Sequence, residues 1–313
     1  MLYGKYQFLC RLENEAHLPS FKGSTFRGVF GHALKKVVCA LKRQECHECL
    51  LKERCVYALV FETQTVLSPA EGSKFSAPPH PFVIEPPQTP ATNFQEGSAF
   101  DFNLLLFGEV NNSLPYFVYA IDQMGRIGIG KKINAARGRF ILKSVQVEDR
   151  IIYSDTDQKL NTTGALETLA LNGQAENIEG TFKVKVILDT PLRIKFENRL
   201  KADLPFHVLV RAMLRRVSAL MHYYGNGEPD LDYRGLVERA RGVSIVASAL
   251  RWFDWQRYSQ RQEREMLMGG MIGSIVYEGK IGEFMPLIDF CSKVHIGKQT
   301  AFGLGKFIAE RVT

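Results

Sequence analysis

One glycine-rich basic segment occurs twice in this chain, and it limits the folds that the chain can adopt. Residues 297–307 read Gly-Lys-Gln-Thr-Ala-Phe-Gly-Leu-Gly-Lys-Phe, and residues 130–140 read Gly-Lys-Lys-Ile-Asn-Ala-Ala-Arg-Gly-Arg-Phe. At a constant offset of 167 residues, the first and ninth glycines, two basic positions and the final phenylalanine coincide. Two copies at so long a period do not form a solenoid, in which short repeats stack on one another. The repeat therefore predicts two tandem domains that share one topology.

The size and composition of the chain fit two domains of a cytoplasmic protein. The chain has 313 residues, of which 45% are hydrophobic, and this is enough for two cores. No segment approaches the roughly 20 consecutive apolar residues of a membrane helix, and the N-terminus lacks the apolar run of a signal peptide. We therefore expect a cytoplasmic location, no membrane partner, and six cysteines that start out reduced.

Hydrophobic periodicity in the first half predicts six main elements and one long loop. The expected order is strand, helix, strand, strand, helix, strand, at residues 3–12, 26–41, 57–67, 99–110, 114–124 and 138–147. Residues 68–97 hold seven of the thirteen prolines, so we expect them to form the loop. This order is the ferredoxin-like βαββαβ arrangement, which RNA-recognition domains share.

The second half repeats this order. Strands are expected at residues 181–196, 244–258, 266–277 and 307–312, and helices at residues 204–224 and 283–293. A polar segment at residues 155–173 reads as the connector. The predicted fold class is α+β, with two ferredoxin-like domains. The first, residues 1–172, carries cysteine-rich and proline-rich insertions, and the second, residues 173–313, ends in the glycine-rich loop.

The first predicted helix has a polar face that could carry chemistry. The face is formed by Gly28, Gly31, His32, Lys35 and Lys36. Two glycines inside one helix cost about 1 kcal/mol each relative to alanine. Two explanations remain open at this stage. Either a ligand or another backbone approaches this face closely, or the helix packs tightly against a neighbouring loop.

Basic side chains also gather on the long helix of the second half and in the two repeated segments. A net charge of +7 and a pI near 9.0 favour a polyanionic partner. The helix stripe consists of Arg211, Arg215, Ser218 and His222, and the repeated segments contribute Lys131, His295, Lys298 and Lys306. Glycine lets backbone N–H groups approach phosphates, and the cations neutralise them. The alternatives are a solvated helix face and a turn that only packs the domains together.

Several sequence patterns of enzymes are absent or incomplete. Residues 125–131 have the glycine spacing of a phosphate-binding P-loop, but Lys132 stands where a Ser or Thr must ligate Mg²⁺. The chain contains no His-Glu-x-x-His, no acidic cluster typical of a two-metal nuclease and no Gly-x-Ser-x-Gly elbow. An ATPase, a zinc protease and an α/β-hydrolase are therefore disfavoured.

Four cysteines follow the first predicted helix with metal-ligand spacing. They are Cys39, Cys46, Cys49 and Cys55, and the middle two form a Cys-x-x-Cys pair. Four thiolates could hold a structural zinc ion that pins the end of the helix. The alternative is a set of reduced thiols in a loop.

Three segments near the C-terminus carry a family pattern. They read Arg-Trp-Phe-Asp-Trp-Gln-Arg-Tyr-Ser-Gln-Arg-Gln at 251–262, Gly-Gly-Met-Ile-Gly-Ser-Ile-Val-Tyr-Glu-Gly at 269–279, and Val-His-Ile-Gly-Lys-Gln-Thr-Ala-Phe-Gly-Leu-Gly-Lys-Phe at 294–307. These segments resemble the CRISPR-associated endoribonucleases that process precursor CRISPR RNA, members of the RAMP superfamily. The domain pattern and the start of the first helix at residues 21–28 extend the resemblance over the whole chain.

The resemblance implies cleavage within the CRISPR repeat without a metal or any other catalytic cofactor. The 2′-hydroxyl of the RNA attacks the adjacent phosphate and leaves a 2′,3′-cyclic phosphate and a 5′-hydroxyl. Members of the family often use a histidine on the first helix with a nearby lysine or tyrosine, and His32 with Lys36 matches that position. His222 and His295 are the rival histidines. The implied partners are repeat RNA and other subunits of a CRISPR effector complex.

Aromatic and cationic residues in the first of these segments add a surface that could stack on RNA bases. They are Trp252, Trp255, Arg257 and Tyr258, and strand alternation allows only some of them to face solvent. Two other functions remain open for the chain. One is a non-catalytic RNA-binding subunit with the same fold, and the other is a basic scaffold whose N-terminal module is held by a metal.

Overall fold

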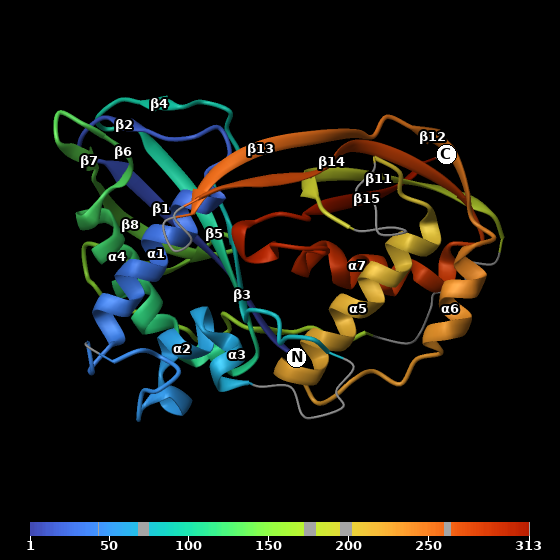
Figure 1. Cartoon of the computed structure of the whole chain (residues 1–313), viewed down its shortest axis with the longest axis horizontal. Helices are drawn as coiled ribbons and strands as arrows, with labels where there is room; N and C mark the ends of the chain where they lie inside the picture. The colour runs from blue at the N-terminus through green and yellow to red at the C-terminus, as the bar shows by residue number, and fades with distance from the viewer. Residues whose placement is uncertain (43, 68–74, 172–179, 195–201, 260–263, 313) are drawn as a thin grey trace. The chain divides into compact units, whose positions relative to one another are not determined.

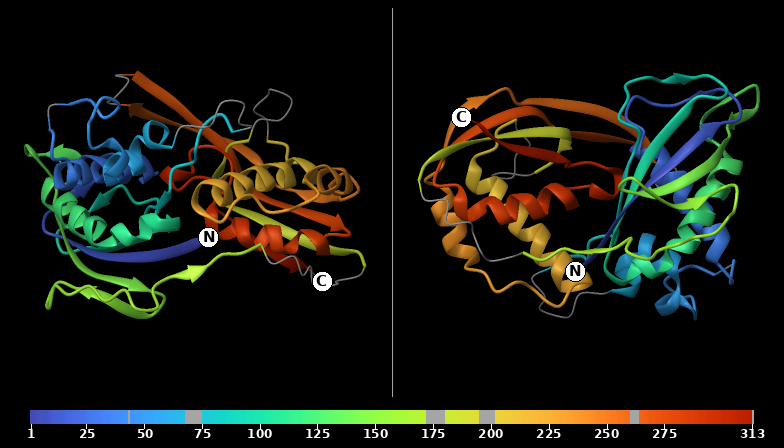
Figure 2. Two further views of the ribbon diagram at one scale, coloured as in Figure 1. Left: turned by 90° about the horizontal axis from the view of Figure 1, so that it is seen from below. Right: turned by 180° about the vertical axis from the view of Figure 1, so that it is seen from behind.

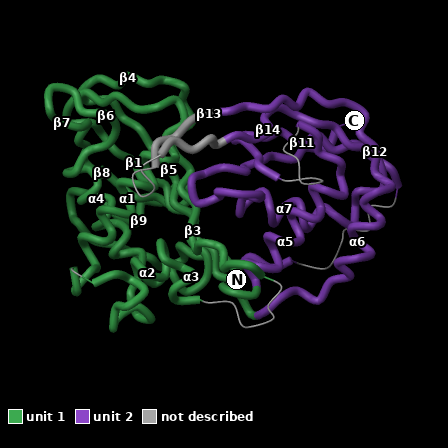
Figure 3. Tube along the Cα trace, viewed as in Figure 1, with its two compact units in different colours: residues 1–168, 222–226 green, residues 169–221, 227–313 purple. Residues whose placement is uncertain are grey.

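The computed structural model describes residues 1–42, 44–67, 75–171, 180–194, 202–259 and 264–312. The chain forms two compact units (Figure 3). Unit 1 comprises Met1–Thr168 and His222–Asn226, and unit 2 comprises Leu169–Met221 and Gly227–Thr313. Each unit is an α+β structure around an antiparallel sheet, as the sequence predicts.

Unit 1 is built on a sheet with the strand order β3-β5-β1-β8-β9, and the short strand β10 (Glu167–Thr168) also pairs with β1. Its main elements along the chain are β1 (Leu2–Leu12), α1 (Gly23–Val38), β3 (Phe82–Glu85), β5 (Ala99–Phe107), α4 (Leu114–Ile127), β8 (Phe140–Val147) and β9 (Arg150–Ser154). The first six elements follow the order βαββαβ, and their strands are arranged as in a ferredoxin-like fold. In Figures 1 and 2, α1 and α4 lie together on one face of this sheet.

Aromatic side chains fill the space between the sheet and the helices of unit 1. The ring of Phe26 on α1 meets that of Phe102 on β5 edge to face, with centroids 5.1 Å apart. Phe102 in turn stacks on Phe8 of β1 at 5.3 Å. All three side chains are buried. Because each ring buries a large apolar area, this cluster fixes which side of α1 faces the core.

The strands of unit 2 follow the order β12-β14-β11-β15, which corresponds to β3-β5-β1-β8 in unit 1. Strand β13 pairs with the N-terminal part of β14. Its elements are β11 (Phe182–Leu192), α5 (Phe206–Tyr224), α6 (Tyr233–Ala240), β12 (Ser244–Ser248), β13 (Arg251–Ser259), β14 (Arg264–Gly279), α7 (Met285–Val294) and β15 (Phe307–Val312). Figure 1 shows α5 and α7 on one face of the sheet. Phe206 anchors α5 between Tyr277 and Phe284, with ring centroids 5.0 and 5.2 Å away.

The structure corrects the predicted strand at residues 57–67. This segment forms two short helices, α2 (Val56–Phe61) and α3 (Thr63–Val66). The strand that completes the sheet is β3, which lies inside the segment predicted to be a proline-rich loop. All four residues of β3 are buried, so its Phe-Val-Ile run is a core strand between prolines. The predicted strand at residues 244–258 is likewise divided into β12 and β13.

The first copy of the repeated basic segment is a hairpin rather than a loop. It consists of β6 (Ile129–Ile133) and β7 (Ala136–Gly138). Asn134 and Ala135 connect the strands with φ angles of 48° and 68°. Two consecutive residues with positive φ are typical of the type I′ turn, whose twist matches that of the strands.

The remaining elements are short. They are β2 (Ala16–His17), β4 (Asn93–Phe94), β10 (Glu167–Thr168), and the 3-10 turns η1 (Lys52–Arg54), η2 (Gly108–Ser113), η3 (Gly282–Phe284) and η4 (Thr300–Phe302). Within the described residues, no helix combines the length and the apolar character that crossing a membrane requires.

Two glycines in the interior of α1, Gly28 and Gly31, differ in their surroundings. A Cβ atom on Gly31 would lie 2.7 Å from Cε1 of Phe61, whose ring also packs against Phe30 and Phe82. A Cβ atom on Gly28 would meet no atom within 4 Å. Tight packing against α2 therefore explains Gly31, whereas Gly28 lies on an open surface.

This difference gives a stability prediction. Gly28→Ala should stabilise the protein by up to about 1 kcal/mol, because alanine favours the helix and nothing opposes its methyl group. Gly31→Ala should destabilise it by roughly 1–2 kcal/mol, because overpacking against the fixed Phe61 ring outweighs the gain in helix propensity. Urea unfolding of both variants measures the two shifts. Equal shifts of the same sign would contradict the packing explanation.

Candidate functional site

The exposed face of α1 is the candidate catalytic surface of unit 1. His32 and Lys36 are exposed and lie one helical turn apart, so their side chains are neighbours. Gly28 precedes His32 by another turn and leaves open space beside it. This part of α1 therefore presents an imidazole and an ammonium group to solvent next to a position without a side chain.

A buried lysine anchors the start of α1. The side chain of Lys22 is fully buried, and its Nζ donates hydrogen bonds to the carbonyl oxygens of Ser20 (3.1 Å) and Thr89 (2.5 Å). Its ammonium group also lies 5.7 Å from the centre of the Phe94 ring, and burial lowers its pKa. Lys22 thus ties the first turn of α1, and with it the His32 face, to the segment after β3.

Lys131 lies on the exposed hairpin of unit 1. In β6 it pairs with His17 of β2, and its side chain is exposed. A Cβ atom on the preceding Gly130 would lie 2.2 Å from the carbonyl oxygen of His17. Gly130 has a φ of 81°, so it is needed for the close approach of the two backbones. The hairpin therefore holds Lys131 on a backbone that is fixed against β2.

In unit 2, residues 295–306 form a loop that is fastened to the end of β11. The N–H of Gly305 donates to the carbonyl oxygen of Pro191 (3.1 Å), and that of Ile296 donates to Gly305 (3.0 Å). A Cβ atom on Gly305 would lie 1.8 Å from the carbonyl oxygen of Ile296. Gly305 also has a φ of 78°, so packing of the loop requires glycine there.

Arg216 and His295 hold this loop from inside. The guanidinium of buried Arg216 on α5 donates to the carbonyl oxygens of Val294 (2.9 Å) and His295 (3.1 Å). His295 is fully buried, and its Nδ1 lies 3.0 Å from the carbonyl oxygen of Leu304. The ring of His295 therefore faces the interior of the loop, and its burial does not support the predicted RNA contact.

The two lysines of the loop have different surroundings. The side chain of Lys298 is exposed, while its backbone N–H donates to the carbonyl oxygen of Arg193 (3.1 Å). Lys306 is half-buried, and its ammonium lies 3.3 Å from a carboxylate oxygen of Asp189. Since Asp189 neutralises much of its charge, Lys306 is a weaker phosphate ligand than its sequence position suggests.

The predicted stripe on α5 is partly exposed. Arg211, Arg215 and His222 are exposed, whereas Ser218 is buried and donates a hydrogen bond to Glu228. His222 belongs to unit 1, where its ring lies 5.1 Å from that of Phe75. The stripe therefore provides two exposed arginines in unit 2, and a histidine in unit 1 that packs against an aromatic ring.

His207 lies one turn before Arg211, and the positive charge nearby affects the pKa of its imidazole. Burial lowers the pKa of its imidazole, and the charges of Arg241 and Arg211 lower it further, while Glu238 acts in the opposite direction. The His207 ring is therefore held neutral near pH 7 beside two arginines.

The four cysteines do not assemble into a metal site. Cys39, Cys46, Cys49 and Cys55 are free thiols. No group of three or more His, Cys, Asp or Glu residues in the described ranges is placed to hold a metal ion. Burial raises the pKa of the Cys46 thiol, although nearby Lys35 opposes the shift. Within the described residues, the structure therefore gives no support to the predicted zinc site.

One predicted RNA-binding residue lies outside the described side chains. The backbone of Arg257 belongs to β13, but its side chain is not described, so its predicted RNA contact stays a prediction.

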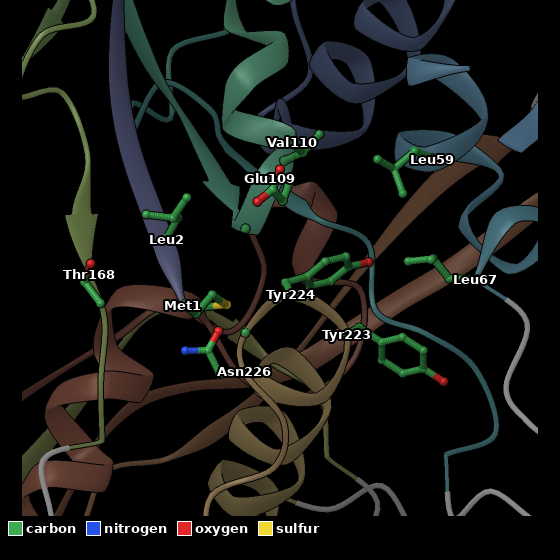
Figure 4. Close-up of a pocket in the computed structure, with 12 residues that line it drawn as sticks. Met1, Leu2, Leu59, Leu67, Glu109, Val110, Thr168, Tyr223, Tyr224 and Asn226 are labelled. Atoms are coloured by element: carbon green, nitrogen blue, oxygen red, sulfur yellow. The ribbon is translucent and has the colours of Figure 1, made fainter. Parts of the chain in front are cut away.

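A pocket of about 500 Å³ opens in unit 1 at the start of β1 (Figure 4). Met1, Leu2, Glu109, Tyr224 and Asn226 are among the residues that line it. Burial lowers the pKa of the amino group of Met1. The residues that line the pocket include none of those predicted to act in catalysis or RNA binding. The pocket is therefore separate from the exposed surface of α1, which remains the candidate catalytic surface of unit 1.

Two supporting residues escaped the sequence analysis. Arg216 sits on the apolar stripe of α5, three residues after Met213 and four before Leu220. A charged residue on an apolar stripe indicates a buried partner, so the sequence could have predicted a structural role for Arg216. Arg193 carried no such signal, because only the three-dimensional arrangement places it beside the loop at residue 298.

Two family models match the chain. Residues 1–165 match the AF_1859_N model, which is described as an N-terminal domain, and residues 186–307 match the model of the CRISPR-associated endoribonuclease Cas6. The chain therefore belongs to the family of this N-terminal domain, and its C-terminal region is a Cas6 domain of the RAMP superfamily.

Known proteins resemble the chain at low sequence identity. A protein of Archaeoglobus fulgidus, described as uncharacterized, is 24% identical over 214 residues, which are 68% of this chain and 67% of the relative. Thermus thermophilus Cas6 has a TM-score of 0.54 at 11% identity, with 98% of this chain and 99% of that chain covered.

Two solved complexes have the same fold. A Cas6 product complex gives a TM-score of 0.56 at 12% identity and covers 98% of this chain and 100% of that chain. A partial Cas6-RT-Cas1–Cas2 complex gives 0.59 at 14% identity and covers 99% of this chain. The chain spans only 46% of the length of that last match.

The buried guanidinium predicts a clear stability difference between neighbouring arginines. Arg216→Met should destabilise the protein by about 1–3 kcal/mol, because the carbonyls of Val294 and His295 lose buried donors. Arg215→Met removes an exposed side chain and should change stability by less than about 0.5 kcal/mol. Thermal unfolding of the pair measures both effects, and two similar melting temperatures would exclude the proposed support of the loop by Arg216.

Proposed function

We propose that this protein is a metal-independent endoribonuclease that cleaves precursor CRISPR RNA within the repeat. The exposed His32–Lys36 pair on α1, in a chain whose residues 186–307 match the Cas6 endoribonuclease model, carries the proposal. The likeness to the Cas6 product complex supports it at the level of the fold. The products are a 2′,3′-cyclic phosphate and a 5′-hydroxyl.

The RNA supplies its own nucleophile in this reaction. The 2′-oxygen forms a bond to the adjacent phosphorus, and the bond from phosphorus to the 5′-oxygen breaks. His32 either accepts the proton of the 2′-hydroxyl or donates one to the leaving 5′-oxygen, which an imidazole can do near neutral pH. Lys36 stabilises the negative charge that builds up on the phosphorane. No step needs a metal ion.

Basic residues outside α1 hold the RNA by its phosphates. Lys131 acts in unit 1, and Lys298, Arg211 and Arg215 act in unit 2, where all three side chains are exposed. Lys306 contributes less, since its ammonium is already paired with Asp189. Arg257 and His222 complete the proposed set.

The organisation and the partners of the protein follow from the same proposal. The shared strand order of the two units supports a duplicated ferredoxin-like domain. The boundary between residues 172 and 173 stays a prediction from the sequence, because it lies among residues outside the described ranges. Because one matching structure is a Cas6-RT-Cas1–Cas2 complex, other CRISPR proteins are the expected protein partners. The protein acts in the cytoplasm.

Replacing His32 tests the proposed catalyst. His32→Ala should slow single-turnover cleavage of repeat RNA by roughly 10²–10⁴-fold, the usual contribution of a general acid or base, with little change in RNA affinity. His47→Ala is the matched control, because His47 is exposed but lies outside α1. Both are assayed in EDTA.

Three outcomes separate the remaining possibilities. If His32→Ala cleaves as fast as the unmodified protein, His32 is not the catalyst, and His222→Ala becomes the next test. Tight binding of repeat RNA without cleavage by the unmodified protein would instead identify a non-catalytic RNA-binding subunit. If the unmodified protein neither binds nor cleaves repeat RNA, the remaining possibility is a basic scaffold.

A further inference from the structure

We propose that the indole of Trp252 is a stacking platform for an RNA base, and that Lys298 contacts a phosphate of the same strand segment. The two residues form a single-stranded nucleotide subsite in unit 2. The inference rests on the proposed function in one respect only, namely that the protein binds RNA.

Trp252 is held in a fixed orientation on β13. Its Nε1 donates a hydrogen bond of 2.8 Å to Oδ1 of Asp254, two residues further along the strand and therefore on the same face. The side chain of Trp252 is only half-buried. Because the hydrogen bond fixes the ring plane in advance, a base that stacks on the exposed part does not have to order the indole.

Gly269 on β14 provides the space in which this pair lies. It is the cross-strand partner of Asp254. A Cβ atom at Gly269 would lie 2.1 Å from Oδ1 of Asp254 and 2.8 Å from Nε1 of Trp252. Any side chain there would displace the indole or its acceptor. The glycine, the carboxylate and the indole therefore form one built unit.

Arg193 joins this unit to the glycine-rich loop. Its Nη1 donates to the carbonyl oxygen of Gly269 (3.4 Å), and its own carbonyl oxygen accepts the N–H of Lys298 (3.1 Å). A Cβ atom on Gly297 would lie 2.8 Å from the same carbonyl oxygen. A single residue after β11 thus contacts both the strand under Trp252 and the backbone of the exposed lysine.

The chemistry of Trp252 and Lys298 defines the class of ligand. An aromatic face accepts any base, because every base has a π surface, and a lysine ammonium binds any phosphate. In a duplex, base faces are covered by neighbouring pairs, so a platform of this kind takes unpaired nucleotides. The subsite therefore binds single-stranded RNA without strong sequence preference.

The tryptophan content of the chain allows a direct spectroscopic test. The chain has two tryptophans, Trp252 and Trp255, so Trp255→Phe leaves the platform as the sole indole reporter. This variant is titrated with an oligoadenylate of about eight nucleotides and with an abasic oligomer of equal length. We expect the oligoadenylate to quench Trp252 emission, while the abasic oligomer binds more weakly and quenches little.

Affinity measurements separate stacking from phosphate contact. Trp252→Ala should weaken oligoadenylate binding by roughly 5- to 150-fold and leave both the abasic affinity and the salt dependence unchanged. Lys298→Ala should lower the slope of log K against log salt by about 0.7 for both oligomers. Phe253→Ala is the control, because Phe253 is exposed on the opposite face of β13 and should have no effect.

The test distinguishes this inference from the proposed function. Quenching and affinity that depend on Trp252, in a protein that does not cleave repeat RNA, would support the subsite and refute the endoribonuclease. If the protein cleaves repeat RNA but Trp252→Ala leaves its affinity for oligoadenylate unchanged, the subsite is overturned and the endoribonuclease proposal stands. Absence of quenching in the Trp255→Phe variant would also overturn it, and this result does not depend on the folding of a Trp252 variant.

Discussion

The backbone hydrogen bonds between the end of β11 and residues 295–306 are the constraint on which unit 2 depends. The amide of Gly305 reaches Pro191 only because a glycine can pass within contact of the Ile296 carbonyl. Arg216 secures the other side of the loop from α5. With the loop fixed in this way, Lys298 stays exposed. The glycines of this loop therefore serve its packing, and its exposed cation Lys298 is a residue that we propose to contact RNA.

In unit 1, the packing of the core is what leaves the candidate side chains exposed. Its aromatic core determines which side of α1 is buried, and Lys22 fixes where the helix begins. His32 and Lys36 are then left on the solvent side as a consequence of helical periodicity. The chemistry assigned to α1 thus depends on a core that lies on its other face.

Long, periodic elements were predictable from the sequence, and short or strained ones were not. The helices α1, α4, α5 and α7 and the strands β1, β11 and β15 follow from hydrophobic periodicity. The strand β3 did not, because three apolar residues and a glutamate between prolines resemble a loop. Residues 56–66 form two short helices, and the ring of Phe61 in the first of them packs against Phe30 of α1. His295 looked like a surface cation, but its burial depends on a contact with Leu304 that no sequence pattern reveals.

The central claim is that the RNA itself, and not a metal-bound water, supplies the attacking oxygen. The direct measurement is cleavage of a repeat RNA in EDTA, compared with the same RNA carrying a 2′-deoxynucleotide on the 5′ side of the cut. The account predicts cleavage of the first to a 2′,3′-cyclic phosphate and a 5′-hydroxyl, and binding without cleavage of the second. Cleavage of the deoxy-substituted RNA, or products with a 3′-hydroxyl and a 5′-phosphate, would contradict it.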